Sequence, residues 1–128
     1  MRYRRLGNTD LQVSVIGLGT MMFGSWGNPD MQACSDIFNT AIDAGINLID
    51  TADIYDDGRS EEILGKCLAG RRDQVVIATK FGNPMRGDNE QSGGSRRWVL
   101  KAVEGSLRRL NTEWIDVYQM HRPDPDTP

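Results

Sequence analysis

The stretch Val75-Val76-Ile77-Ala78-Thr79-Lys80 decides the fold, because it is a short apolar, β-branched run that ends in a charged residue. Such a run is typical of a strand that is buried on both faces of a parallel sheet. No apolar run in the chain approaches the ~18 residues of a transmembrane helix. We therefore expect a buried parallel strand over residues 75–80, with Lys80 at its carboxyl end.

Strand and helix patterns alternate on both sides of this run. The expected parallel strands cover residues 15–19, 47–50, 75–80 and 115–120, and a hairpin of residues 3–6 and 11–14 precedes them. Apolar residues at helical spacing predict a first helix with Pro29 in its first turn and Gly45 at its end. A second helix is expected with Ser60 as its N-cap, and a third follows Ser95. This alternation predicts right-handed crossovers and a parallel sheet.

Two parallel-sheet architectures compete for this pattern. In a doubly wound nucleotide-binding fold, the first strand-to-helix turn carries a glycine fingerprint, but Met22 stands where its third glycine belongs after Gly17. A Walker A loop fails as well, because Cys67 follows Gly65-Lys66 where Ser or Thr is required. The doubly wound interpretation is therefore the weaker one.

The reactive side chains favour a (β/α) barrel. Asp50 ends the second expected parallel strand, Lys80 the third and His121 the fourth. Catalytic groups of barrel enzymes lie at the carboxyl ends of the strands, where the rim converges on one pocket. Each residue also has a non-functional interpretation. Asp50 could cap a turn, Lys80 could be the first solvated residue after a buried strand, and His121 could be a surface or core histidine with its hydrogen bonds satisfied. Their equivalent positions together favour the functional interpretation.

Composition and charge restrict the possible partners. The chain of 128 residues carries 15 basic and 18 acidic side chains, a net charge of -3. This balance argues against a nucleic-acid or anionic-membrane partner, since both require clustered positive charge. Cys34 and Cys67 lack metal-ligand spacing, so we expect free thiols in a reducing cytoplasm and no metal site. Gly7, Asn8 and Asp10 interrupt the region where a signal peptide needs an apolar stretch.

Four ordered motifs extend over the chain. They are Tyr3-Arg4-Arg5-Leu6-Gly7 with Val13-Ser14-Val15-Ile16-Gly17-Leu18-Gly19-Thr20, Asn47-Leu48-Ile49-Asp50-Thr51-Ala52-Asp53-Ile54-Tyr55 with Ser60-Glu61-Glu62-Ile63-Leu64-Gly65, Ala78-Thr79-Lys80-Phe81, and Tyr118-Gln119-Met120-His121-Arg122-Pro123. Together they resemble the aldo-keto reductase family, in which an aspartate precedes a tyrosine by five residues. The resemblance implies a barrel enzyme that reduces small aldehydes or ketones with NADPH.

The resemblance also assigns roles to four residues. Tyr55 is expected to be the general acid that protonates the carbonyl oxygen as hydride reaches the carbon. An ordinary tyrosine hydroxyl is a reluctant donor, so the ammonium of Lys80 would stabilise its anion and Asp50 would hold that ammonium in place. His121 would hydrogen-bond the carbonyl oxygen and orient the substrate.

The family's early cofactor contacts correspond to residues near the ends of the first two strands. The resemblance places them at Gly19, Thr20 and Met21, with Asp50 at the nicotinamide ribose. In the alternative interpretation, Thr20 has no cofactor contact and only hydrogen-bonds backbone groups of a turn.

Two loops on the catalytic rim are candidates for substrate contact. Phe23 and Trp26 lie after the first strand, where the family places apolar substrate contacts, with core packing as the alternative for both. The glycine-rich stretch 82–94 follows the Lys80 strand, and a loop of this length is usually either functional or disordered.

Length is where the chain departs from the family. An eight-stranded barrel takes roughly 250 residues. We therefore expect residues 1–128 to form an incomplete aldo-keto reductase domain, the N-terminal half of a (β/α)8 TIM barrel. It would have about four parallel strands, three helices and an N-terminal β-hairpin. Such a half would be poorly active alone and would self-associate, through its exposed strand edges and through inner faces such as that of Ile77.

Two other functions remain open. A barrel lyase would use Lys80 to form a Schiff base, although the Asp50–Tyr55 spacing speaks against it. A non-catalytic binding or assembly module is the other alternative, because the family fold also serves as a regulatory subunit.

Overall fold

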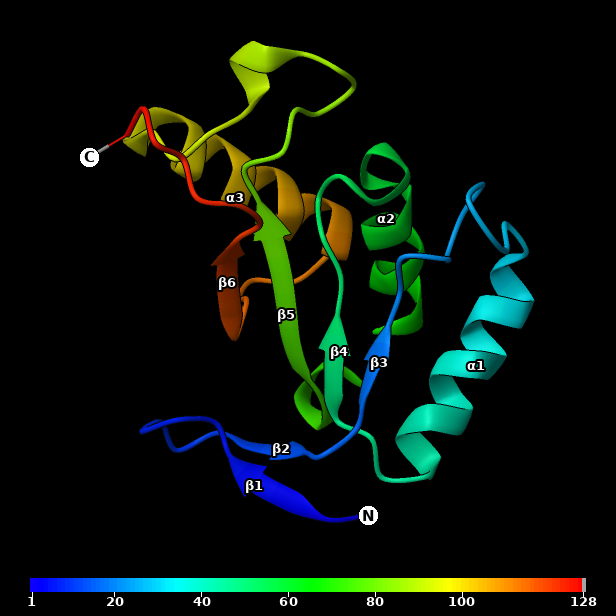
Figure 1. Cartoon of the computed structure of the whole chain (residues 1–128). Helices are drawn as coiled ribbons and strands as arrows, with labels where there is room; N and C mark the ends of the chain where they lie inside the picture. The colour runs from blue at the N-terminus through cyan, green and yellow to red at the C-terminus, as the bar shows by residue number, and fades with distance from the viewer. Residues whose placement is uncertain (128) are drawn as a thin grey trace.

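A computed structural model describes residues 1–127. Its centre is a sheet of four parallel strands in the order β3-β4-β5-β6, which are Gly17–Gly19, Leu48–Asp50, Val76–Phe81 and Val117–Met120. The helices α1 (Met31–Asp43), α2 (Arg59–Cys67) and α3 (Arg96–Leu110) lie along one side of the sheet (Figure 1). Short 3-10 turns occupy Tyr55–Gly58 (η1), Arg72–Gln74 (η2) and Asn89–Gln91 (η3). This architecture confirms the predicted first half of a (β/α)8 barrel.

An antiparallel hairpin of β1 (Tyr3–Arg5) and β2 (Gln12–Ser14) lies near the amino ends of the parallel strands (Figure 1). Asn47 joins it to β4, because its side-chain oxygen accepts from the Ser14 backbone N–H at 2.7 Å. The Ser14 hydroxyl oxygen in turn accepts from the Asn47 backbone N–H at 3.0 Å. The hairpin is therefore fixed at the end of the sheet opposite to the candidate catalytic rim.

The core fills the layer between the sheet and the helices. Ile49 of β4 and Ile77 of β5 have no exposed surface, and they pack in one cluster with Phe38, Leu64 and Leu110 from the three helices. Full burial of such a side chain contributes roughly 1.5–3 kcal/mol. Ile77 therefore faces the helices, and the expectation that it lines an uncovered inner face is wrong.

The helix ends agree only in part with the sequence prediction. Ser95 caps α3 by accepting from the Trp98 N–H, and Gly45 follows α1 with a left-handed φ of 90°, as expected. Pro29, in contrast, precedes the helix, and the side chain of Asp30 caps α1. Ser60 lies inside α2 rather than at its start, so its predicted capping role is wrong.

Arg72 stabilises the amino-terminal side of β5 and β6. Its guanidinium forms an ion pair with Asp116 at 2.7 Å, and both side chains are largely buried. It also donates to the carbonyl oxygens of Val75 and Trp114 and lies 4.2 Å from the centroid of the Trp114 ring. A lysine at this position would keep the positive charge, but its ammonium could not make the same contacts as the planar guanidinium.

Over residues 1–127, none of the helices combines the length and the apolar character needed to cross a membrane.

Candidate active site

The predicted reactive residues come together at the carboxyl ends of the parallel strands. Asp50 is the last residue of β4, Lys80 lies one residue before the end of β5, and His121 directly follows β6. Tyr55 begins the η1 turn that follows β4. All four therefore lie at the end of the sheet marked by the arrowheads of these strands in Figure 1. The register explains this, because parallel neighbours place successive strand ends side by side.

Lys80 is the centre of the cluster. Its Nζ lies 2.6 Å from Asp50 Oδ1, 2.9 Å from the Thr51 carbonyl oxygen and 3.4 Å from the Tyr55 hydroxyl. A lysine ammonium has three donors, and these three acceptors use all of them. The Lys80 side chain is only 16% exposed, so its position is well determined. The Thr51 carbonyl is a contact that the sequence analysis missed, since no side-chain pattern reports it.

His121 lies on the other side of Tyr55. The two rings meet edge to face, with centroids 6.0 Å apart and an angle of 84° between their planes. Burial, followed by the positive charges of Lys80 and Arg122, lowers the pKa of His121 below its ordinary value. These effects favour the neutral imidazole. Its Nδ1 is buried and has no hydrogen-bond partner within residues 1–127.

The candidate cofactor residues differ in what they can offer. Asp50 is paired with Gly19 across β3 and β4, and its side chain remains 43% exposed although Lys80 holds one oxygen. Gly19 leaves open space where a side chain would stand, and Met21 is 48% exposed. Thr20, however, is fully buried, and its hydroxyl lies 3.0 Å from the Ser60 hydroxyl. The backbone of Thr20 is engaged as well, because its N–H donates to the Asp50 carbonyl and its carbonyl oxygen accepts from the Phe23 N–H and the Ser60 hydroxyl. Thr20 therefore presents no exposed group to a ligand in this structure.

The two rim loops are well structured. Phe23 is 5% exposed and belongs to the core cluster, whereas Trp26 is 51% exposed on the same loop. The loop of residues 82–94 contains η3 and is closed at its base, where the Gly93 N–H donates to the Gly82 carbonyl at 2.9 Å. Of the two aromatic candidates, Trp26 is the one available to a substrate.

A buried polar cluster beneath the rim was not anticipated from the sequence. Glu61 is fully buried, pairs with Arg109 at 2.7 Å and accepts from the Thr79 hydroxyl at 2.6 Å. Asp53 is 1% exposed, and neither of its carboxylate oxygens has a hydrogen-bond partner in the described chain. Burial, followed by the nearby charge of Glu61, raises the pKa of Asp53 to about 7. The Asp53 N–H also donates to the Lys80 carbonyl at 3.0 Å, so this cluster adjoins the catalytic candidates.

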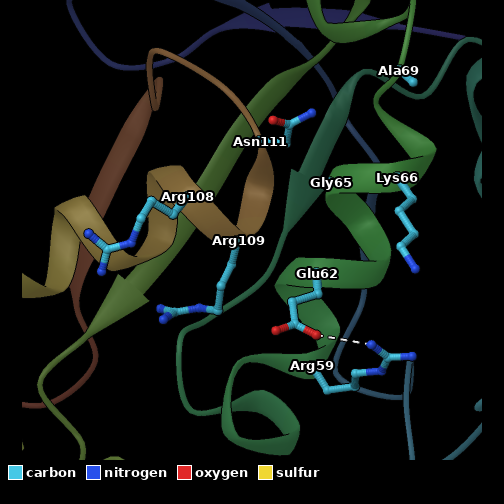
Figure 2. A pocket seen from close by; sticks show the side chains of 8 residues that line it. All are labelled: Arg59, Glu62, Gly65, Lys66, Ala69, Arg108, Arg109 and Asn111. Carbon is cyan, nitrogen blue, oxygen red and sulfur yellow. Dashed lines mark hydrogen bonds and ion pairs between the residues drawn. The ribbon is translucent and has the colours of Figure 1, made fainter.

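A separate groove of about 730 Å³ lies between α2 and α3 (Figure 2), and Lys80 is not among the residues that line it. Arg59 and Glu62 form an ion pair of 3.0 Å on its wall, and Arg109 is engaged with Glu61 behind it. Gly65 allows the two helices to meet, because a Cβ there would lie 2.5 Å from the Arg109 carbonyl oxygen. The groove therefore reflects helix packing and does not include the candidate catalytic residues.

Comparisons with known proteins agree with this geometry. The chain is 42% identical to aldo-keto reductase YhdN of Bacillus subtilis, in an alignment that covers all of this chain and 40% of that protein. It is 37% identical to a protein of Oryza sativa subsp. japonica named as a probable voltage-gated potassium channel subunit beta, of which it covers 39%. The structure matches the holo form of an aldo-keto reductase from Bacillus halodurans with a TM-score of 0.89 and 40% identity, over all of this chain and 42% of that one.

The chain thus spans about 40% of the length of the curated relatives it matches. The model of the aldo/keto reductase family matches residues 15–128, so the chain belongs to the aldo/keto reductase family.

Proposed function

We propose that this chain carries the proton-transfer centre of an NADPH-dependent reductase that converts small aldehydes or ketones into alcohols. One observation carries the proposal: Lys80 Nζ is 2.6 Å from Asp50 and 3.4 Å from the Tyr55 hydroxyl, on the rim where barrel enzymes place their chemistry. Residues 1–128 would be the aldo-keto reductase-like domain that holds this centre, and the full reaction is a proposal for the longer protein that its relatives represent.

Tyr55 would donate the proton. Negative charge builds on the carbonyl oxygen of the substrate, and the Tyr55 hydroxyl protonates it. Lys80 stabilises the tyrosinate that remains, because its ammonium is already directed at the hydroxyl oxygen. Asp50 and the Thr51 carbonyl hold the ammonium in that position. This pre-arranged charge needs no reorganisation during the reaction.

His121 would orient the substrate. A neutral imidazole has one N–H donor, which suits a hydrogen bond to a carbonyl oxygen. The edge-to-face contact with Tyr55 places the imidazole beside the proton donor. His121 and Tyr55 would then bind the same oxygen from two sides, which fixes the orientation of the carbonyl.

The carboxyl ends of β3 and β4 would hold part of the cofactor. The partly exposed Asp50 carboxylate suits a ribose hydroxyl, and Gly19 and Met21 border the same region, with the buried Thr20 between them. NADPH, when bound, supplies the hydride.

The edges of the sheet lead to a proposal about assembly. β3 pairs only with β4 and β6 only with β5 within the described chain, and Ile16 and Met120 are exposed beside these edges. Unpaired edges bind other strands, so we expect the isolated 128-residue chain to self-associate. Sedimentation that shows a monomer across a wide concentration range would contradict this.

A cytoplasmic location fits the cysteines. Cys34 and Cys67 are both buried free thiols, which persist most readily in a reducing compartment.

The decisive experiment combines this chain with the rest of a relative's length. Residues 1–128 are joined to the part of YhdN that the alignment does not cover, and the loss of NADPH absorbance is followed with propanal and benzaldehyde. Tyr55→Phe keeps the ring and removes the proton donor, so turnover should fall by at least about 100-fold. Tyr3→Phe serves as the matched control. It removes the hydroxyl of a hairpin tyrosine, which donates to the Gly45 carbonyl, and turnover should be unchanged. Equal turnover in the Tyr55→Phe protein would remove Tyr55 from the mechanism.

One relative supports a second candidate function. The Oryza sativa relative bears the name of a channel subunit, so a non-catalytic assembly role is the alternative for this chain. A joined protein with native circular dichroism that binds NADPH but turns over no carbonyl would favour that role. A Schiff-base lyase is less favoured, because three oxygen atoms surround Lys80 Nζ and occupy its donors, whereas attack on a carbonyl needs an accessible nitrogen with a free electron pair. Trapping of an aldehyde on Lys80 by borohydride would revive it.

A further inference from the structure

Two consecutive aspartates that follow Tyr55 have an unusual backbone. Asp56 and Asp57 both adopt left-handed conformations, with φ/ψ of 50°/43° and 50°/41°. Residues other than glycine rarely do so, although aspartate tolerates this region better than most. Such backbone persists where surrounding contacts hold it, and it is concentrated at functional sites. The contacts that hold it here run to two other rim loops.

Asp56 binds the loop between β3 and α1. One carboxylate oxygen accepts from the Ser25 backbone N–H at 2.7 Å, and the other accepts from the Ser25 hydroxyl. These hydrogen bonds lower the pKa of Asp56, so the group is ionised at neutral pH. The close approach depends on Gly24, which has a φ of 125° and where a Cβ would collide with the Asp56 carboxylate.

The loop held by Asp56 is closed on itself. The Gly24 N–H donates to the Asn28 carbonyl at 2.9 Å, and the Asn28 N–H donates to the Met22 carbonyl at 2.8 Å. Residues 22–28 therefore behave as one unit, which carries the exposed Trp26 directly after Ser25. Fixing Ser25 fixes the position of Trp26 relative to Tyr55.

Asp57 binds the loop that follows β5. Its Oδ1 accepts from the Arg86 backbone N–H at 3.0 Å, and Arg86 itself has a left-handed φ of 52°. The residue after Tyr55 thus holds the loop on one side of the rim, and the next residue holds the loop of residues 82–94 on the other.

We propose that Asp56 and Asp57 are positioning residues that form a clasp, tying the loops of residues 22–28 and 82–94 to the Tyr55 segment. The clasp sets the width of the substrate entrance, with Trp26 as the wall on the Asp56 side. Its effect on the substrate rests on the proposed function, whereas the tie between the loops does not.

Amide hydrogen exchange of the 128-residue chain tests the tie. Glycine accepts a left-handed backbone, so Asp56→Gly and Asp57→Gly remove one side chain each and keep the turn. Asp56→Gly should speed exchange of the Ser25 N–H on the order of 5-fold and leave the Arg86 N–H unchanged. Asp57→Gly should do the reverse, so each variant is the control for the other. Unchanged exchange at both amides, or equal changes in both variants, would overturn the clasp.

Kinetics of the joined protein described above test the effect on the substrate. Asp56→Gly should raise KM for benzaldehyde several-fold and leave kcat within about two-fold, because the proton-transfer residues stay in place. Asp56→Asn should restore KM, since asparagine tolerates the same backbone and still accepts from the Ser25 N–H. A fall in kcat with unchanged KM would overturn the positioning role. An inactive joined protein would contradict the proposed reductase function, and the exchange result would still decide the clasp.

Discussion

Asp53→Asn gives the sharpest test of the polar layer beneath the rim. Asp53 is 1% exposed, and its carboxylate lacks a hydrogen-bond partner within residues 1–127. Burial, then the charge of Glu61, raises its pKa from 3.8 to about 7, while Arg109 partly opposes this. Burial of the Tyr118 hydroxyl, followed by the charges of Asp53 and Glu61, raises the pKa of Tyr118 as well. Between pH 3.8 and about 7, the folded protein therefore keeps a proton on Asp53 that the unfolded chain releases.

The sign and size of the effect follow from this difference. Below pH 3.8 both states are protonated, and the contribution of the protonated carboxyl to stability is fully present. As the pH rises toward 7, only the unfolded chain loses the proton, so stability falls by about 1.4 kcal/mol per pH unit. The loss levels off above the folded-state pKa of about 7. Between pH 5 and pH 7 the wild-type chain should lose about 2 kcal/mol through this one group.

Urea unfolding of the 128-residue chain at pH 5, 6, 7 and 8 measures the effect. Asp53→Asn has no titrating group at this position. Its free energy of unfolding, relative to that of the wild type, should therefore rise by about 2 kcal/mol from pH 5 to pH 7 and then stay nearly constant. Asp10→Asn removes an exposed carboxyl in the hairpin loop and is the control for the loss of one acidic side chain. A constant difference for Asp53→Asn would refute the argument that Asp53 is protonated in the folded state.

Three further predictions concern the rim and the packing below it. His121 is the only histidine, so its NMR resonance titrates alone; its pKa should be below the ordinary value and should rise in Lys80→Met, because the nearby positive charge is removed. Gly65→Ala should cost about 1–3 kcal/mol in urea unfolding, since its Cβ would collide with the backbone of α3, whereas Gly19→Ala meets open space and should cost little. Arg72→Lys should lower stability by about 1–2 kcal/mol in thermal unfolding, because a point charge cannot replace the planar contacts of the guanidinium; a Tm equal to that of the wild type would contradict this.

The sequence was sufficient to predict the arrangement that depends on strand periodicity. A β-branched run ending in Lys80 determines both a buried parallel strand and the side of the sheet where its charged end lies. The same logic places Asp50 and His121 beside it, and the structure brings their strand ends together. Tyr55 was found through the family motif, because nothing in the local pattern shows that a loop tyrosine turns back toward a lysine.

The contacts that were missed depend on which way a side chain turns between layers. Serine is a residue type that is common at N-caps. Ser60, however, lies inside α2, and its hydroxyl donates to the Thr20 carbonyl at 2.6 Å. Asp53 follows a strand as a turn residue would, but in the folded chain it is only 1% exposed. The pair Asp56-Asp57 before Gly58 indicates a turn, whereas its contacts with two distant loops depend on the assembled rim. Local pattern sets the backbone, and tertiary packing sets these partners.

The same contacts hold together the proposed proton-transfer centre of this chain. Lys80 and Asp50 lie on adjacent strands, and the Asp53 N–H fixes the start of the Tyr55 segment against the Lys80 carbonyl. Asp56 and Asp57 then hold that segment from both sides. The hydrogen bonds that fix Lys80 and the Tyr55 segment therefore come from β4, β5 and the loops that follow β3, β4 and β5, and His121 after β6 adds an edge-to-face contact. Under the proposed function, the joined protein should therefore turn over carbonyls without any change in residues 1–128.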